Sequence, residues 1–238
     1  MNKWFLKKIY GRILDRIFNP FFGINLKPIP LELKDEDKCL VIAPHPDDES
    51  IGCGGILNLY PKNFDVICLT SPSDERIEEF KAAMEFAGIK NFKMLNLKDK
   101  HISEGFEEFK AIDISGYDHI FIPYVFDQHK DHKAVSLLLE KHLRTAKHKG
   151  DLKIVFYEVW SAISLPQYYL NISSVAKKKE EMINFHKSQI ATKDYAQKIL
   201  GLNSYRGLLK SLDYVESFMI LNTKQFSQII NNLKWGDD

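Results

Sequence analysis

Cysteine is scarce in this chain, and the few cysteines present form no disulfide pattern. Cys39, Cys53 and Cys68 are neither an even set nor a Cys-x-x-Cys pair. This excludes a disulfide-stapled scaffold and favours buried free thiols in a reducing compartment. An excess of either charge sign is also missing, since 33 Lys and Arg face 32 Asp and Glu, for a formal net charge of +1. That balance argues against a nucleic-acid binder that relies on a global positive field.

Long hydrophobic runs are absent as well. No uninterrupted apolar stretch of the sequence reaches the roughly 18 residues that suggest a transmembrane helix. The basic N-terminus lacks the continuous apolar region and the small-residue cleavage site of a signal peptide. Hydrophobic residues make up 45% of the 238 residues and charged residues 27%, as in an ordinary soluble globular protein. We therefore expect a cytoplasmic protein.

The N-terminal segment qualifies this expectation. Between residues 2 and 22, apolar residues recur at helical spacing and most lysines and arginines fall on the opposite face. A basic amphipathic helix of this kind can lie peripherally on an anionic membrane, here at its inner face. The alternative is a helix packed on the domain or between subunits of a homo-oligomer. We divide the chain into an N-terminal amphipathic helix and linker, residues 1–37, and a main domain, residues 38–238.

From residue 38 onward, strand-like runs alternate with helical patterns. The strands are expected at Cys39–Ala43, Phe64–Thr70, Phe92–Leu97, His119–Tyr124 and Lys153–Val159. The clearest helices between them are expected at Ser50–Tyr60, Asp74–Ala87 and Asp131–Thr145. This rhythm predicts an α/β, Rossmann-like three-layer fold with a mostly parallel central sheet. Ligands of such sheets bind beyond the carboxyl ends of the strands.

Histidines and carboxylates follow two of the expected strands. Residues 44–49 read Pro-His-Pro-Asp-Asp-Glu directly after the run 39–43, and residues 127–132 read Asp-Gln-His-Lys-Asp-His after the run 119–126. Burying so many ionisable groups is costly unless a metal or a close partner compensates. Both clusters fall at strand ends, so they can converge at one edge of the sheet. The sequence therefore predicts a hydrolase that uses a divalent metal to activate water.

The two motifs together resemble the LmbE-like, PIG-L family of zinc-dependent N-deacetylases. Residues 44–55 read Pro-His-Pro-Asp-Asp-Glu-Ser-Ile-Gly-Cys-Gly-Gly, residues 127–132 follow in the expected order, and the likeness extends over about residues 38–221. The resemblance implies an enzyme that removes N-acetyl groups from amino sugars and their conjugates. It also implies one Zn²⁺ per chain, although a mixed carboxylate and imidazole ligand set tolerates Fe²⁺ too.

Residue roles follow from the chemistry, and the resemblance assigns the same metal ligands. Hydrolytic zinc takes three protein ligands; these are expected to be His45, Asp48 and His132. Asp47 lies beside Asp48 in the sequence and can aim its carboxylate at the attacking water, which matches its family role as general base. Two further catalytic residues are expected to be His129, which would stabilise the oxyanion or protonate the leaving amine, and Asp131, which would orient or tune His129.

Two further residues are candidates for substrate binding. By resemblance, Arg76 would hold a substrate hydroxyl or phosphate; the alternative is a solvated arginine at the start of a helix. His186 falls in a stretch that resembles the family's C-terminal helix near the mouth of the site. Residues 70–74 read Thr-Ser-Pro-Ser-Asp, where many members carry a glycine-containing turn, so the substrate-facing loop is expected to be remodelled. Aromatic residues that could stack on a sugar ring or pack in the core are Trp160, Tyr168 and Tyr169.

We therefore expect a zinc-dependent N-deacetylase acting on an amino sugar or glycoconjugate. The amphipathic N-terminus favours a cell-envelope glycan or a lipid-linked intermediate, and a soluble N-acetylglucosaminyl thiol or sugar nucleotide is the alternative. A family member that binds metal and sugar without turnover stays open, although the intact Asp47 and His129 argue against it. A two-metal phosphoesterase would need a further cluster of acidic residues, which the sequence does not offer.

Overall fold

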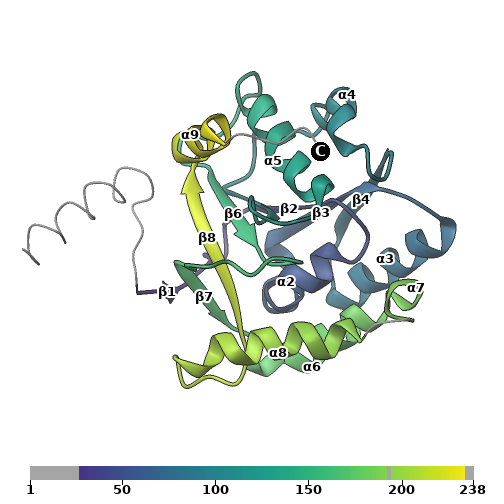
Figure 1. Cartoon of the computed structure of the whole chain (residues 1–238), viewed down its shortest axis with the longest axis vertical. Coiled ribbons are helices and arrows are strands. Elements are labelled where there is room, and N and C mark those ends of the chain that lie inside the picture. Colours follow the sequence, from purple (N-terminus) through teal and green to yellow (C-terminus); the bar gives the residue numbers. More distant parts are fainter. Residues whose placement is uncertain (1–26, 192–193, 234–238) are drawn as a thin grey trace, which may run out of the picture.

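Within residues 27–191 and 194–233, which the structure describes, eight strands form one central sheet in the order β1-β7-β8-β6-β5-β2-β3-β4 (Figure 1). The structure is a computed structural model of the chain. The strands are β1 Ile29–Pro30, β2 Cys39–Ala43, β3 Phe64–Thr70, β4 Asn91–Leu97, β5 His119–Pro123, β6 Lys153–Tyr157, β7 Tyr168–Asn171 and β8 Val215–Asn222. Among these strands β8 alone runs antiparallel to its neighbours. The predicted α/β fold with a mostly parallel sheet is confirmed.

Helices cover both faces of the sheet (Figure 1). One face carries α2 Asp48–Leu59, α3 Asp74–Ala87, α6 Ala176–Asn184, α7 Lys187–Ile190 and α8 Tyr195–Leu208. The other carries α4 Phe106–Phe109, α5 Lys130–Leu143 and α9 Thr223–Asn232. Short 3-10 turns are η1 Pro61–Asn63, η2 Ile102–Glu104 and η3 Ser173–Val175.

Strand β2 shows why the sheet is covered on both sides. Leu40 and Ile42 belong to the hydrophobic core shared with α5 and α9, whereas Cys39 and Val41 belong to the core shared with α2, α3 and α6. Successive side chains point to opposite faces of a strand, so a strand buried on both faces has no polar positions to spare. The continuous apolar run at residues 39–43 is the sequence signature of that burial.

The N-terminal part of the chain joins this sheet at its edge. Ile29–Pro30 lies inside the predicted linker, and its Ile29 pairs in parallel register with Tyr168 of β7. The predicted amphipathic helix at residues 2–22 lies outside the described residues. Among the helices of the described ranges, none is long and apolar enough to cross a membrane.

Candidate metal centre and active site

The candidate site lies where the carboxyl ends of neighbouring parallel strands meet. The segments that follow these ends are residues 44–48 after β2, 71–76 after β3, 98–100 after β4, 124–132 after β5 and 158–163 after β6. Since β6, β5, β2, β3 and β4 are adjacent in the sheet, the sheet order brings together side chains that are distant in sequence. The crevice at these ends is the usual ligand position in a parallel α/β sheet.

One carboxylate oxygen connects the predicted metal ligands. Asp48 Oδ2 lies 3.2 Å from His45 Nδ1 and 3.3 Å from His132 Nε2. The backbone amide of His45 donates to the same oxygen at 2.9 Å, which closes the loop that precedes α2. All three residues are buried. The structure therefore brings the three predicted ligands together around one point.

Each of the two histidines turns its second ring nitrogen toward an outer carboxylate. His45 Nε2 lies 3.1 Å from Asp131 Oδ2, and His132 Nδ1 lies 3.4 Å from Asp127 Oδ1. Metal-binding imidazoles are commonly oriented in this way, with one nitrogen directed to the metal and the other held by a carboxylate. The contacts leave His45 Nδ1 and His132 Nε2 beside Asp48, as a shared ligand position would require.

These contacts add a second role for Asp131, whose charge also opposes the lowering of the pKa of His129 by burial, as is expected of a tuning carboxylate. Its carboxylate faces His45 rather than His129, and it also accepts the backbone amides of Lys100 at 2.7 Å and Ile102 at 3.4 Å. His129 instead caps the N-terminus of α5, where its Nδ1 accepts the backbone N–H of Asp131 at 3.2 Å. The side chains of His129 and Asp131 point in different directions, because His129 is the N-cap residue and does not have helical backbone angles.

The carboxylates stabilise positive charge at this point. Burial lowers the pKa of His45, but hydrogen bonds to Asp131 and Asp48 outweigh burial and raise that pKa to about 10. Burial likewise lowers the pKa of His132, but Asp48 and Asp127 outweigh it and raise the pKa to about 9. Burial raises the pKa of Asp48, but the two histidines outweigh burial and lower it. The same environment suits either imidazolium groups or a bound cation.

The buried nitrogens of His132 fit a metal ion. Within the described part of the chain, both ring nitrogens of this fully buried residue lie near carboxylates, but neither contact has the geometry of a hydrogen bond. A buried polar atom without a partner is costly, and coordination by Nε2 would remove that cost. Imidazole and carboxylate donors suit Zn²⁺ and Fe²⁺. The residues present therefore fit the metal that the sequence predicts.

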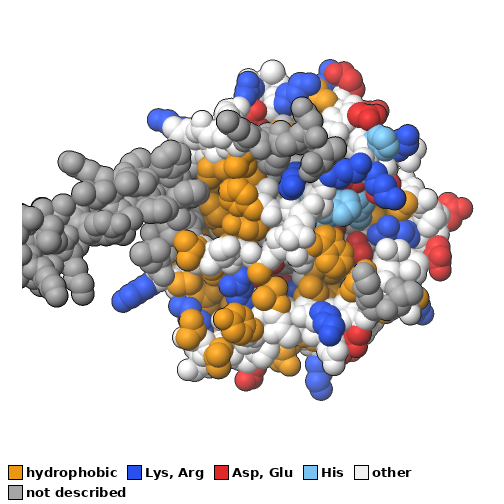
Figure 2. Space-filling model, viewed as in Figure 1, with side chains coloured by type: hydrophobic (Ala, Val, Ile, Leu, Met, Phe, Trp, Pro, Cys, Tyr) orange, Lys and Arg blue, Asp and Glu red, His pale blue; other side chains and the backbone are white. Residues whose placement is uncertain are grey.

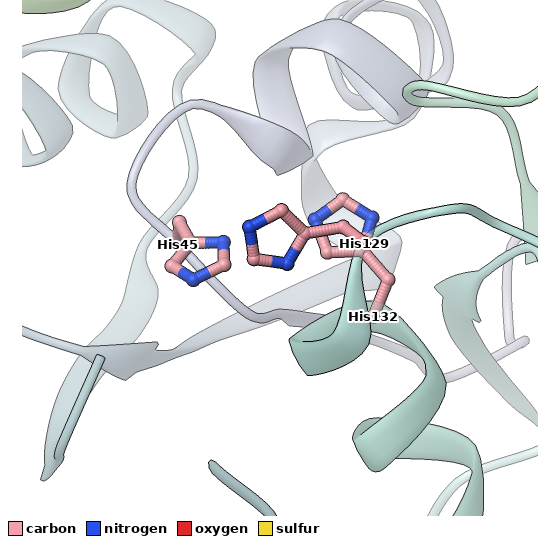
Figure 3. A group of neighbouring side chains, drawn as sticks. All are labelled: His45, His129 and His132. Carbon is pink, nitrogen blue, oxygen red and sulfur yellow. The ribbon is translucent and has the colours of Figure 1, made fainter. Parts of the chain in front are cut away.

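His129 lies next to this centre but differs from the ligands in its protonation. Ligand atoms of His45, His129 and His132 all lie within 4.8 Å of one another (Figure 3). Because His129 Nδ1 accepts a backbone N–H, the proton of the neutral ring resides on Nε2. A nitrogen that binds a metal must be unprotonated, so His129 offers a donor rather than a ligand. Burial and the neighbouring His132 and His45 lower the pKa of His129, which favours the neutral ring.

Asp47 has an unusual backbone for a non-glycine residue. Its φ angle is 130° at the N-cap of α2, a region that side chains rarely adopt and that is often found at functional sites. Its backbone N–H donates to Glu49 Oε2 at 3.2 Å. Burial raises the pKa of Asp47, and Asp48 raises it further, to about 7, despite the opposing charges of His186 and Arg76. A carboxylate with this pKa can take up and release a proton near neutral pH.

The two predicted substrate-binding residues support the Asp47 loop from different sides. Arg76 Nη2 donates to Pro46 O at 2.6 Å and lies 3.4 Å from Asp47 Oδ1, so this arginine is not a freely solvated one. His186 is only 1% exposed, and its Nε2 lies 3.3 Å from Glu49 Oε1 and 3.0 Å from Ser50 Oγ.

The position of His186 corrects its predicted role at the mouth of the site. The ring is enclosed between α2 and the turn that joins α6 to α7, and its Nε2 is engaged by side chains of α2. A substrate cannot reach a side chain that is buried to this degree. His186 instead holds Glu49, which in turn accepts the backbone N–H of Asp47.

Two acidic residues near the centre, Asp127 and Asp99, were given no role from the sequence, whereas Trp160 was expected to stack on a sugar ring or pack in the core. Asp127 accepts the amides of Trp160 at 3.0 Å and Ser161 at 3.1 Å, while its other oxygen faces His132. Asp99 Oδ1 lies 3.1 Å from His45 Nε2 with a side chain 42% exposed. Trp160 packs against Tyr195, with ring centroids 5.3 Å apart. Asp99 follows the end of a predicted strand, as the motifs at residues 44–49 and 127–132 do. This position could have marked Asp99 as a candidate site residue.

A comparison with protein families matches the part of the chain that carries both motifs. The family model described as PIG-L, GlcNAc-PI de-N-acetylase, matches residues 40–143. This range begins in β2, contains the loop with His45 and Asp48, and ends with α5, which contains His132.

Solved structures show the same fold. N,N'-diacetylchitobiose deacetylase from Pyrococcus horikoshii is 20% identical, with 92% of this chain and 93% of that chain covered and a TM-score of 0.67. A conserved protein from Thermus thermophilus is 23% identical, with 76% and 93% covered and a TM-score of 0.63. The 4-carboxy-2-hydroxymuconate hydratase from Pseudomonas putida is 17% identical, with 78% and 96% covered and a TM-score of 0.61. At these identities the likeness concerns the fold, and the similarity to the PIG-L, GlcNAc-PI de-N-acetylase family rests on the motif-bearing segment, residues 40–143.

Proposed function

We propose that this protein is a metal-dependent N-deacetylase that hydrolyses the acetamide of an amino sugar or glycoconjugate. The observation that carries the proposal is the convergence of His45 and His132 on Asp48 Oδ2, beside the buried carboxylate of Asp47. The family match supports amide hydrolysis on sugar-related substrates. The fold alone does not indicate amide hydrolysis, because a hydratase has the same fold.

The roles of the side chains follow from their contacts. A divalent ion held by His45, Asp48 and His132 would supply a Lewis acid for the amide carbonyl and make water more acidic. Asp47 takes a proton from the attacking water, whose oxygen forms a bond to the carbonyl carbon. His129 presents its Nε2–H to the carbonyl oxygen as negative charge develops there.

Collapse of the tetrahedral centre breaks the carbon–nitrogen bond and yields acetate and a free amine. The leaving nitrogen needs a proton, and Asp47 can return the one it took from water. Arg76, 3.4 Å from Asp47 Oδ1, fixes the carboxylate between these two proton transfers. Asp131 and Asp127 hold the rings of His45 and His132 in place.

Acetate release from a panel of N-acetylglucosamine compounds tests the proposal. The panel contains the free sugar and its nucleotide-linked, thiol-linked and lipid-linked forms, each incubated with zinc-loaded protein. We expect acetate from one class, abolished by a chelator and restored by adding zinc. A lipid-linked substrate is the form that we favour, and acetate from a nucleotide-linked or thiol-linked form would identify a soluble substrate.

Two other results of the same panel would overturn the proposal. Acetate that persists after metal removal, confirmed by metal analysis of the protein, would contradict metal dependence. No acetate from any compound, with one metal bound per chain and sugar binding detected by calorimetry, would indicate a family member that binds without turnover.

Trp160 is expected to contribute to sugar binding at this site. Two amides of its loop are fixed by Asp127, and its ring, 44% exposed, packs against Tyr195. Aromatic faces beside a polar centre suit the apolar face of a sugar ring. Trp160→Ala should raise KM on the order of tenfold with little change in kcat, whereas Trp160→Phe should retain most of the affinity. Tyr205→Ala, which removes an exposed aromatic ring from the far end of α8, is the matched control.

The kinetics of the Trp160 variants are read on one soluble substrate, so that membrane binding does not enter. An equal KM for Trp160→Ala and the wild type would contradict a stacking role. A fall in kcat without a change in KM would instead indicate that the 158–163 loop acts only through Asp127.

A further inference from the structure

Exposed apolar side chains gather at one end of the molecule. Among the described residues, the large hydrophobic side chains with the greatest exposure are Leu209 at 91%, Tyr205 at 70% and Leu208 at 69%. All three lie at the C-terminal end of α8. Leu165, before β7, and Ile29, in β1, are exposed as well.

Hydrogen bonds join these segments into one surface. Lys210 Nζ donates to Pro28 O at 2.9 Å, which ties the end of α8 to the residues before β1. Ile29 N donates to Gln167 O at 3.0 Å, and Arg206 Nη2 donates to Ile163 O at 2.7 Å. We call the surface formed by Ile29, Leu165, Tyr205, Leu208 and Leu209 the apolar face. Figure 2 shows hydrophobic side chains, with Lys or Arg among them, gathered over this end of β7 and α8.

The chain outside the described residues continues from this surface. Residues 1–26 directly precede Lys27 and Pro28, and Pro28 contacts Lys210 at the edge of the apolar face. This segment contains five Lys and Arg against one Asp. Its apolar residues recur at helical spacing and are Trp4, Phe5, Leu6, Ile9, Tyr10, Ile13, Leu14, Ile17 and Phe18. A cationic amphipathic sequence thus joins the folded domain beside its most exposed leucines.

We propose that the apolar face and residues 1–26 together bind an anionic membrane surface. Exposed leucines contribute favourable binding free energy when they insert at the boundary of headgroups and acyl chains. Lysines and arginines contribute it through contact with anionic headgroups. Lys210 contacts a carbonyl oxygen and the ring of Tyr169, so these contacts do not neutralise its charge. The two parts supply the two signals, apolar and cationic, that stable peripheral binding requires.

The apolar face is connected to the metal centre by one loop. Trp160 and Ser161 donate to Asp127 beside His132, and the same loop continues to Leu165 on the apolar face. A substrate whose sugar is attached to a lipid could therefore place its acetamide near the site while its lipid stays in the membrane. This use of the surface rests on the proposed function, whereas membrane binding itself does not.

Vesicle flotation with the full chain tests the proposal. The vesicles contain phosphatidylcholine alone or phosphatidylcholine with phosphatidylglycerol. We expect binding to the anionic vesicles only, weakened by added salt. The double variant Leu208→Ser/Leu209→Ser, and separately Lys7→Glu/Lys8→Glu, should each lower the partition coefficient by about tenfold. Phe86→Ser, which replaces a less exposed apolar residue on α3, is the control and should leave binding unchanged.

Several outcomes would overturn the proposal. Equal vesicle binding by the wild type and the leucine variant would exclude the apolar face as a membrane contact. A dimer in light scattering that is lost in the leucine variant would show a contact between two copies instead. Leu209→Ser alone, at a side chain that is almost fully exposed, provides a second test that does not disturb the core. Flotation needs no turnover, so its result is independent of the acetate assay.

Discussion

Asp47→Asn is expected to lower deacetylation by about 10²- to 10⁴-fold, the range for loss of a general acid–base group, while the metal is retained. Asparagine keeps the shape of the side chain but cannot accept the proton of the attacking water. Metal binding should persist because His45, Asp48 and His132 are unchanged. Steady-state acetate release and the metal content of the same preparation measure the two effects together.

The control for this variant is Asp74→Asn, which removes an acidic residue from the first turn of α3 and should leave the rate unchanged. Full activity in Asp47→Asn would contradict the assignment of Asp47 as the base. Loss of both activity and metal would instead place Asp47 among the ligands. The strained φ of Asp47 makes a thermal midpoint necessary as well, to show that the variant is folded at the assay temperature.

The sequence was sufficient to predict the elements whose side chains are buried on both faces or on one stripe. Cys39–Ala43, Phe64–Thr70 and Asp74–Ala87 agree with the observed β2, β3 and α3, because local periodicity decides such elements. β1, β7 and β8 were not predicted as strands. Ile29–Pro30 and Tyr168–Asn171 are short, partly exposed segments. Tyr168–Asn171 pairs with β8, which comes later in the chain, and Ile29–Pro30 pairs with Tyr168–Asn171 at the edge of the sheet.

In the site, too, the sequence predicts what depends on local pattern and does not predict what depends on the tertiary fold. The convergence of His45, Asp48 and His132 could be predicted because each belongs to a segment that follows a strand end, and strand ends converge in a parallel sheet. The sequence could not predict which carboxylate contacts the second ring nitrogen of each histidine, because Asp127 and Asp131 occur in the same motif. Their partners depend on how α5 begins, with His129 as its cap. His186 approaches Glu49 from the turn between α6 and α7, and no local pattern indicates that its ring is buried.

A buried ion pair secures α2, the helix that follows the metal loop. Lys179 Nζ lies 2.7 Å from Glu216 Oε1, and both side chains are almost fully buried. The Glu216 carboxylate also accepts the backbone amides of Gly55 at 2.6 Å and Ile56 at 2.9 Å. The approach is this close because Gly55 has no Cβ, which would lie 2.8 Å from Glu216 Oε1. One carboxylate therefore joins β8 to both α2 and α6.

Glu216→Gln is expected to lower the free energy of unfolding by about 3–5 kcal/mol, the range for removing one partner of a buried ion pair. Glutamine can still accept an amide of α2 through its side-chain oxygen. It leaves the Lys179 ammonium buried without a counter-charge, which is the costly part of the change. Urea unfolding of the wild type and the variant, compared at equal slopes, measures the difference.

A double variant separates the buried charge from the rest of the contact. Lys179→Met/Glu216→Gln removes both charges while keeping an acceptor for the α2 amides, so it should regain most of the lost stability. Glu78→Gln breaks a pair with Lys81 in which both side chains are exposed and should change stability little. A Glu216→Gln protein as stable as the wild type would show that the pair does not secure α2. A double variant as unstable as Glu216→Gln would assign the loss to the amide contacts rather than to the uncompensated lysine.

The same double variant also tests whether this distant contact positions a metal ligand. Because Asp48 is the first residue of α2, metal affinity measured on the folded double variant reports how far the contact positions Asp48.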